Sequence, residues 1–306
     1  MFRGRGSFLV VLISSVTVFL TLLQIYLKVA PNLRRRYANE FGGGEKIRKL
    51  PDCIIIGAKK GGTRALLEFI NIHPDVEISP FEVHFFNMER QYSRGLHWYR
   101  SQMPLAAPGQ LVVEKSPNYF VSRDTPGRIF EINKDIKLVL AVREPVERAI
   151  SDFVQSYQRH NLTFERLAFK DGDGTFESVN TAWSAIKTSS YARHLERWLE
   201  VFPRAQILVV ECGDLTADPA GQLRRVERFL GLRPHISQQN FFFSRQKGFM
   251  CWRRGPDDPG HCLGDRKGLK HPEVHPAAVA RLRRHFSALN KRFFELVGTE
   301  FNWPQQ

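Results

Sequence analysis

Short runs of consecutive apolar residues alternate with amphipathic segments along residues 51–306. The runs are typical of strands buried on both faces, and we expect strands at Cys53–Ile56, Leu111–Lys115, Lys137–Val142 and Gln206–Glu211. Helical periodicity predicts helices after Gly62, after Pro145, and at Thr125–Asn133, Tyr191–Phe202, Leu223–Leu230, Ala277–Phe286 and Lys291–Val297. This alternation favours an α/β fold, a central parallel sheet flanked by helices, in which ligands bind at the C-terminal ends of the strands.

A cationic glycine turn separates the first strand from its helix. It contains Lys59, Lys60, Gly61, Gly62 and Thr63. The glycines let backbone N–H groups approach an anion, and the helix N-terminus and the lysines add positive charge. The lysines precede the glycines, whereas a Walker A loop places lysine after its last glycine. The turn is predicted to bind a phosphate-like anion, and an ordinary βα turn with surface lysines remains the alternative.

Three further charged groups follow strand-like segments. They are the segment from Glu82 through His84 to Asn87, the pair Glu114 and Lys115, and Arg143 with Ser151 eight residues later. An arginine and a hydroxyl two helical turns apart are suited to grip one phosphate together. No clustered carboxylates indicate a divalent metal, so we expect metal-free transfer of an anionic group from a nucleotide donor.

The net charge adds one point to this picture, namely the class of ligand that the domain favours. The formal net charge is +14, and residues 1–36 contain six basic residues and no acidic one, which leaves +8 on the remainder. A basic domain favours anionic partners, although many soluble domains are mildly basic. The hydrophobic content of 42% is ordinary for a globular protein with a full core.

The N-terminal region predicts a membrane anchor. Residues 8–27 form an uncharged apolar run of 20 residues, which as a helix spans about 30 Å. Basic residues follow it in place of a cleavage site, so we expect a cytoplasmic tail at 1–7, a signal anchor at 8–27, a stem at 28–50 and a catalytic domain at 51–306. Basic residues on both sides do not set the orientation by themselves, so the cytoplasmic position of the tail depends on the glycosylation triplet. The glycosylation triplet that begins at Asn161, if it is used, places the domain in a secretory lumen.

The four cysteines fall into two classes. Cys53 and Cys212 lie in apolar runs and are expected to be unreactive core residues. Cys251 and Cys262 flank a loop rich in Gly, Pro and Asp, and a disulfide between them is expected in an oxidising compartment. The spacing of the cysteines does not indicate a zinc site.

Several of these motifs resemble those of one enzyme family. Cys53–Arg64 resembles the 5′-phosphosulfate loop of sulfotransferases, and Arg143–Ser151 resembles their 3′-phosphate segment. More closely, the chain is similar to heparan sulfate glucosamine 3-O-sulfotransferases at Gly57–Leu67, Glu82–Phe86, Val113–Pro117, Lys247–Cys251 and Phe301–Trp303.

The resemblance implies a fold, a reaction and a location. The fold would be the P-loop-like sulfotransferase fold, with 3′-phosphoadenosine 5′-phosphosulfate as the donor. The acceptor would be the 3-hydroxyl of a glucosamine in heparan sulfate, so the polyanionic partner would be a polysaccharide and not a nucleic acid. The protein would be a single-pass type II protein of the Golgi membrane, with its catalytic domain in the lumen.

The resemblance also implies roles for individual residues. The donor would be held by Lys60, Gly61, Gly62, Thr63 and Arg64 at the 5′-phosphosulfate, by Arg143 and Ser151 at the 3′-phosphate, and by a closing loop of Lys267, Gly268, Leu269, Lys270 and His271. Glu82 would be the general base. Lys60 and Lys115 would offset charge developing during transfer. The sugar would contact Glu82, His84, Asn87, Lys115 and Gln155.

Two positions depart from the family pattern. Asn87 stands where the family often has aspartate, and Leu269 stands where it has an arginine, with Lys270 as the nearest substitute. They motivate one alternative, a catalytically weak protein that binds heparan sulfate. A sulfotransferase acting on another glycosaminoglycan is the second alternative. A P-loop kinase is disfavoured by the placement of the lysines and by the lack of a metal-binding acid.

Overall fold

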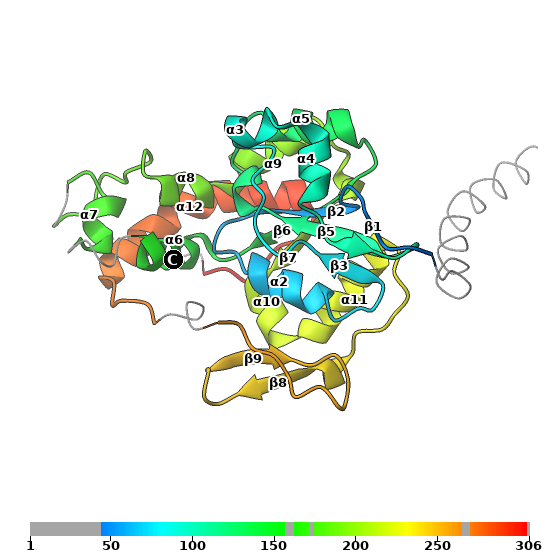
Figure 1. The fold of residues 1–306 in the computed structure, drawn as a ribbon. Helices are drawn as coiled ribbons and strands as arrows, with labels where there is room; N and C mark the ends of the chain where they lie inside the picture. The colour runs from blue at the N-terminus through cyan, green and yellow to red at the C-terminus, as the bar shows by residue number, and fades with distance from the viewer. Residues whose placement is uncertain (1–43, 157–161, 172–173, 265–269, 305–306) are drawn as a thin grey trace, which may run out of the picture. The chain divides into compact units, whose positions relative to one another are not determined.

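The computed structural model describes residues 44–156, 162–171, 174–264 and 270–304 (Figure 1). Contacts divide the chain into one unit of Met1–Ile47 with Ala106–Gln110 and a second of Arg48–Leu105 with Leu111–Gln306. The boundaries fall within β1 (Ile47–Arg48) and β4 (Leu105–Ala106), which pair with each other. The expected tail and anchor, and the start of the stem, lie outside the described residues. In the part that is described, no helix has the length and apolarity needed to cross a membrane.

A five-stranded parallel sheet forms the centre of the second unit. Its strand order is β3-β5-β2-β6-β7, with β3 at Val76–Ile78, β5 at Leu111–Lys115, β2 at Cys53–Gly57, β6 at Lys137–Val142 and β7 at Ile207–Glu211. The predicted parallel sheet is confirmed, and the four predicted strands agree with the structure to within one residue at each end. The sequence analysis missed β3, because three residues are too few to produce a recognisable pattern.

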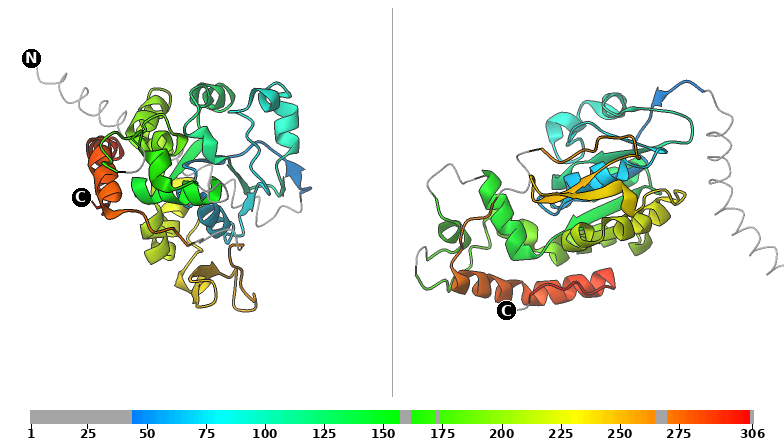
Figure 2. Two further views of the ribbon diagram at one scale, coloured as in Figure 1. Left: turned by 90° about the vertical axis from the view of Figure 1, so that its left-hand side faces the viewer. Right: turned by 90° about the horizontal axis from the view of Figure 1, so that it is seen from below.

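Helices and one hairpin surround the sheet. The helices are α2 (Thr63–Ile70), α3 (Glu89–Tyr92), α4 (Gly95–Ser101), α5 (Thr125–Ile132), α6 (Pro145–Ser156), α7 (Phe164–Ala168), α8 (Ser184–Ser189), α9 (Tyr191–Leu199), α10 (Cys212–Ala217), α11 (Pro219–Leu230) and α12 (Pro276–Val297). The 3₁₀ turns are η1 (Pro117–Tyr119), η2 (Arg204–Gln206) and η3 (Gln238–Asn240), and the hairpin pairs β8 (Phe241–Ser244) with β9 (Phe249–Trp252). Figures 1 and 2 show α2 and α11 on one side of the sheet and α5 and α9 on the other.

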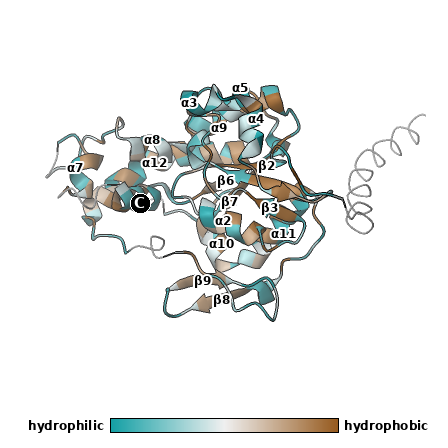
Figure 3. Ribbon diagram, viewed as in Figure 1, coloured by the Kyte–Doolittle hydropathy of each residue, from teal (hydrophilic) through white to brown (hydrophobic). Residues whose placement is uncertain are grey.

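The strands are apolar because both faces of the sheet are covered. Every residue of β2 and β5 is buried, and Figure 3 shows apolar colour concentrated on the central strands while the helices carry both colours. Alternate residues of β2 face opposite sides, and Cys53 and Ile55 belong to the core that packs against α2, α11 and the hairpin. Burial on both faces explains why the strands read as continuous apolar runs.

The prediction of two C-terminal helices, Ala277–Phe286 and Lys291–Val297, is wrong. The structure has one helix, α12, of 22 residues. The residues between the two predicted segments include no glycine or proline, and the polar side chain of Asn290 is buried, so it does not interrupt the helix. The helix ends at Gly298, which adopts a left-handed conformation with φ of 72°.

The predicted disulfide is confirmed, and Cys53 is a core residue as predicted. The prediction that Cys212 is a core residue is wrong, because β7 ends at Glu211 and Cys212 is half-buried at the start of α10. A disulfide joins Cys251 of β9 to Cys262. Cys53 and Cys212 are free thiols, and burial raises the pKa of Cys212 to about 11 and that of Cys53 further. A thiol with a raised pKa is mostly protonated at neutral pH and is therefore a poor nucleophile.

The turn between β2 and α2 packs tightly against the end of β6. The N–H group of Ala58 donates to the carbonyl of Ala141 at 2.7 Å, and that of Gly61 donates to the carbonyl of Ala58 at 2.9 Å. A Cβ atom on Gly61 would lie 2.3 Å from the carbonyl oxygen of Ala141. Gly62 has a φ of 92°, which favours glycine. The turn therefore requires glycine at these two positions for steric reasons.

We expect Gly61→Ala to lower the free energy of unfolding by about 2 kcal/mol, because the turn must shift away from β6 to admit a methyl group. Gly127→Ala in α5 is the matched control. No atom lies within 4 Å of a Cβ at Gly127, so the alanine should stabilise the helix by about 0.5 kcal/mol. Urea unfolding of both variants measures the difference, and equal stabilities would contradict the packing argument.

Candidate functional site

A cleft of about 1110 Å³ collects residues from loops that follow the C-terminal ends of the strands. The predicted site residues that line it are Lys60, Gly62, Thr63, Arg64, Glu82, Lys115, Arg143, Ser151, Gln155 and His271. Gly61 lies in the same turn, His84 contacts Glu82, and Asn87 contacts His84. Lys267, Gly268, Leu269 and Asn161 fall outside the described residues. Four separate segments of the sequence thus meet in one place, as the parallel sheet predicts.

The first wall of the cleft is the β2–α2 turn. The first turn of a helix leaves N–H groups without intrahelical partners, and Gly62, the residue before α2, has no side chain to cap them. Thr63 is buried, and Arg64 is half-exposed and pairs with Glu68. Lys60 has a φ of 71°, an uncommon conformation for a residue with a side chain. Backbone N–H groups, a helix N-terminus and lysine together form a site for an anion.

The second wall is the start of α6. Glu144 accepts a hydrogen bond from the N–H group of Glu147 at 2.7 Å and so caps the helix. Arg143 pairs with Glu147, with the closest nitrogen and oxygen 2.8 Å apart. The hydroxyl of Tyr191 donates to the carbonyl of Arg143 at 2.8 Å. Arg143, two positions before α6, and Ser151 within α6 therefore line the cleft together, and this arrangement suits a second anion.

The third wall carries a carboxylate, an imidazole and an ammonium group. Glu82 Oε2 lies 3.3 Å from His84 Nε2, and Glu82 Oε1 accepts a hydrogen bond from Lys115 Nζ. His84 Nδ1 lies 3.2 Å from Asn87 Oδ1. Lys115 is buried, whereas the side chain of Glu82 is 42% exposed and opens to the cleft. A carboxylate placed this way is accessible to a proton donor that enters the cleft.

These contacts shift the pKa values of the group in opposite directions. The hydrogen bond from His84, assisted by Lys115, lowers the pKa of Glu82 to about 2. The same hydrogen bond raises the pKa of His84, and the Asn87 side chain adds to the effect. A protonated imidazole has two N–H donors, and Glu82 and Asn87 supply an acceptor for each. Asn87 thus accepts the bond that an aspartate would accept, without a second negative charge.

A buried acid, Glu114, supports this wall; the sequence placed it among the charges at strand ends but gave it no role of its own. Glu114 is fully buried, and burial raises its pKa to about 7. It accepts a hydrogen bond from the hydroxyl of Ser116, and the Ser116 oxygen in turn accepts one from the N–H group of His84 at 2.9 Å. His84 has a φ of 54°, and this chain of hydrogen bonds holds it there. The only signal in the sequence was the position of Glu114 beside Lys115.

The closing loop is described only in part. His271 lines the cleft, and its pKa is lowered by burial and by the nearby positive charge of Arg143 and Lys60. The loop therefore reaches the two cationic walls at its C-terminal end. Gln155 is exposed at the end of α6 and lines the cleft. Among the described residues, no three His, Cys, Asp or Glu side chains are grouped to hold a metal ion.

Sequence comparison relates the chain to known proteins. A family model described as a sulfotransferase domain matches residues 50–257. Human heparan sulfate glucosamine 3-O-sulfotransferase 3B1 is 46% identical over 269 residues, covering 87% of this chain and 68% of the relative. The human 3A1 enzyme is 47% identical over 263 residues, covering 85% of this chain and 64% of the relative. The chain thus spans about two thirds of the length of these two relatives.

Comparison with solved structures supports the same fold. A sulfotransferase from Alicyclobacillus acidocaldarius superposes with a TM-score of 0.60 over 83% of this chain and 98% of that chain. The two sequences are 23% identical in this alignment, so the likeness concerns the fold alone.

We expect His84→Ala to raise the pKa of Glu82 from about 2 towards its ordinary value, because the largest cause of the lowering is removed. In the folded protein the pKa of Glu82 is lowered, so its contribution to stability is present above pH 4.5 and is lost as the pH falls towards 2. The pKa of His84 is raised, so its contribution is present below pH 6.5 and is lost as the pH rises through the folded value.

The stability difference between the wild type and His84→Ala should therefore be largest between pH 4.5 and 6.5. Urea unfolding across pH 3–9 measures it, and ¹³C NMR of the Glu82 carboxylate follows the pKa directly. His97→Ala in α4, an exposed position, is the matched control. A Glu82 pKa that stays near 2 in the His84 variant would contradict the assignment.

Proposed function

The chain belongs to the heparan sulfate glucosamine 3-O-sulfotransferase family, and on this basis we propose that it transfers a sulfuryl group to the 3-hydroxyl of glucosamine residues in heparan sulfate. The donor is 3′-phosphoadenosine 5′-phosphosulfate. One observation carries the proposal: two sites suited to anions and an exposed carboxylate line the same cleft. A donor with phosphate at both its 5′ and 3′ positions requires two such sites, and an acceptor hydroxyl requires a base beside them.

The residues fit the donor at both ends. The turn with Lys60, Gly61 and Gly62 has the open backbone that a 5′-phosphosulfate requires, since any side chain on Gly61 would clash with β6. Arg143, just before α6, and Ser151 of α6 suit the 3′-phosphate, because a guanidinium fork and a hydroxyl both donate hydrogen bonds to an anion. The donor supplies the sulfuryl group, and these residues bind and orient it.

The reaction moves one proton and exchanges one bond to sulfur. The 3-hydroxyl oxygen of the acceptor forms a bond to sulfur as the bond between sulfur and the bridging phosphate oxygen breaks. The electron pair of the broken bond stays on the phosphate, and Glu82 takes the hydroxyl proton. Lys60 and Lys115 offset the negative charge that develops on the sulfuryl oxygens and the leaving phosphate.

The contacts of Glu82 explain how donor binding can increase its basicity. With a pKa of about 2, Glu82 is ionised at neutral pH but is a weak base. Its partner Lys115 is buried and lines the cleft, so a bound sulfuryl group competes with Glu82 for the ammonium. Loss of that partner raises the basicity of Glu82 in the presence of the donor. The hydrogen bond from His84 keeps the carboxylate oriented.

The domain order follows the family assignment together with the apolar run at 8–27. We place a cytoplasmic tail at 1–7, a signal anchor at 8–27, a stem at 28–50 and the catalytic domain at 51–306. The catalytic domain lies in the Golgi lumen, where Cys251 and Cys262 can be oxidised and Asn161 can be glycosylated.

We expect Glu82→Gln to lower kcat for sulfate transfer by about 10²- to 10⁴-fold, because an amide of the same shape cannot take the proton. Glu89→Gln is the matched control, since Glu89 is exposed on the next helix and pairs with Arg128. Transfer of ³⁵S from the donor to heparan sulfate by the full-length protein measures both. Unchanged kcat in the Glu82 variant would remove its role as the base.

The same assay separates the alternatives. Heparan sulfate should accept label at the glucosamine 3-hydroxyl, and chondroitin sulfate and dermatan sulfate should not. Label on one of those two polymers instead would identify a sulfotransferase with another acceptor. Binding to heparin with no nucleotide-dependent rise in Tm would identify a polyanion-binding protein without the reaction.

We expect the full-length protein expressed in cells to resist extraction from membranes at alkaline pH, because residues 8–27 are long enough to span a bilayer. Asn161→Gln should remove one glycan and increase its mobility on gels, and Asn133→Gln, which is in no glycosylation triplet, should not. Recovery of the protein in the alkaline supernatant would contradict the anchor. An unchanged mobility of the Asn161 variant would contradict the lumenal glycan.

A further inference from the structure

Arg148 is a fully buried arginine within α6, between the two positions proposed to hold the 3′-phosphate. Its guanidinium donates from Nε to the hydroxyl of Ser189 at 2.7 Å and from Nη2 to the carbonyl of Ala185 at 2.5 Å. From Nη1 it donates to Asp152 at 3.0 Å and to the carbonyl of Lys59 at 3.1 Å. The side chain has no exposed surface, so it acts on bound molecules only through its neighbours.

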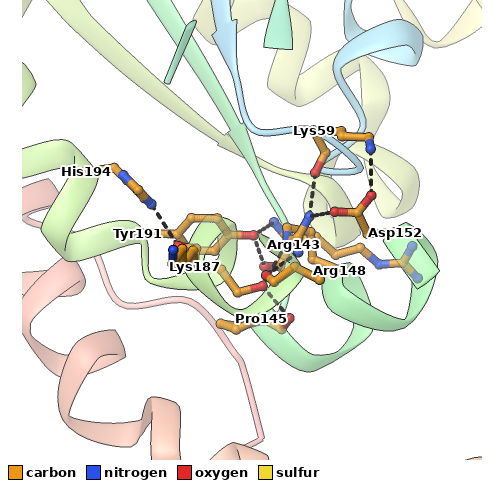
Figure 4. Close-up of polar contacts among 10 residues, drawn as sticks. Lys59, Arg143, Pro145, Arg148, Asp152, Lys187, Tyr191 and His194 are labelled. Carbon is orange, nitrogen blue, oxygen red and sulfur yellow. Dashed lines mark hydrogen bonds and ion pairs between the residues drawn. The ribbon is translucent and has the colours of Figure 1, made fainter. Parts of the chain in front are cut away.

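The contact with Lys59 crosses from α6 to the β2–α2 turn. Lys59 is held at both ends, because its carbonyl accepts from Arg148 and its ammonium lies 2.8 Å from Asp152 (Figure 4). The next residue is Lys60, whose φ of 71° persists only where neighbouring contacts fix the backbone. Arg148 and Asp152 lie one turn apart on α6 and form an ion pair that anchors this backbone.

The other side of Arg148 fixes the start of α6. The hydroxyl of Ser189 accepts from Arg148 and donates to the carbonyl of Pro145 at 2.7 Å. Pro145 is the first residue of α6 and follows Arg143 by two positions. One guanidinium therefore connects the turn of Lys60 with the start of α6, which Arg143 precedes by two positions.

From these contacts we infer that Arg148 is a positioning residue that sets the conformation of the Lys60 turn relative to α6, and thereby matches the protein to the distance between the 5′- and 3′-phosphates of its nucleotide. The inference rests on the proposed function. A lysine in place of Arg148 lacks the planar fork that reaches several acceptors at once. A buried charge with this many partners is held in one geometry, since each lost partner leaves a buried polar group unsatisfied.

The test compares two nucleotides that differ by one phosphate. Adenosine 3′,5′-bisphosphate uses both sites, and adenosine 3′-monophosphate uses only the site on α6. The ratio of their Kd values, measured by titration calorimetry on the full-length protein, reports what the 5′-phosphate contributes. A variant that is partly unfolded weakens both ligands by the same factor, so the ratio does not respond to a merely structural role.

We expect Arg148→Met to reduce this ratio by about tenfold or more, because the turn loses the donor that holds the Lys59 carbonyl. Ser189→Ala removes one acceptor of Arg148 at little cost in volume, and should reduce the ratio about two- to fivefold. If Arg148→Met does not fold, the ratio measured for Ser189→Ala tests the inference. Arg204→Met is the matched control.

Arg204 is more exposed than Arg148, but it also donates to backbone carbonyls, namely those of Ile207, Leu296 and Val297. Arg204 precedes the N-terminal end of β7, whereas the cleft lies at the C-terminal ends of the strands. The Arg204 variant should therefore keep the wild-type ratio of Kd values. A wild-type ratio in both the Ser189 variant and any folded Arg148 variant would overturn the inference. A wild-type protein that binds neither nucleotide would instead overturn the proposed function, and the inference with it.

Discussion

Cations that must bind an anionic donor lie close together, and their repulsion has to be offset before a ligand is bound. Four cationic side chains that line the cleft each have a carboxylate partner. The pairs are Lys59 with Asp152, Arg64 with Glu68, Lys115 with Glu82, and Arg143 with Glu147. In each pair the acid holds the cation in place. Arg64 and Glu68 share one helix, and the other three acids come from a neighbouring segment. The cleft is therefore lined by ion pairs in which an anionic ligand can replace the carboxylate.

The pairs differ in what an exchange does. Arg143 and Glu147 lie one turn apart at the helix surface, and such exposed pairs are weak, so a phosphate can displace the carboxylate at low cost. Lys115 is buried, and its partner Glu82 is the proposed base. Under the proposed function, exchange there would change the chemistry as well as the binding, because His84 lowers the pKa of Glu82 most and the exchange would remove the further lowering by Lys115. If Glu82 is the base, as proposed, donor binding and activation of the acceptor would be two results of this one exchange.

Local patterns were sufficient to predict four of the five strands of the central sheet and many of the residues that line the cleft. Apolar runs gave four strands, and the glycine turn and strand-end charges gave Lys60, Glu82 and Arg143. The supporting residues could not be predicted, because their roles depend on partners distant in the sequence. Arg148 and the carbonyl of Lys59 are 89 positions apart. Burial, which decides that such an arginine is structural, has no signature in a polar residue on an amphipathic helix.

Asn87 has nearly the shape of an aspartate but carries no charge. An aspartate at this position would accept the same bond from His84 and would add a negative charge near Glu82 and the buried Glu114. That charge would raise the pKa of His84 further and would also raise the pKa of Glu82. Asparagine keeps the imidazole of His84 oriented through the same contact, and it places no second carboxylate against the ring. A change at position 87 is thus a change in the basicity of the base, made without altering the fold of the site.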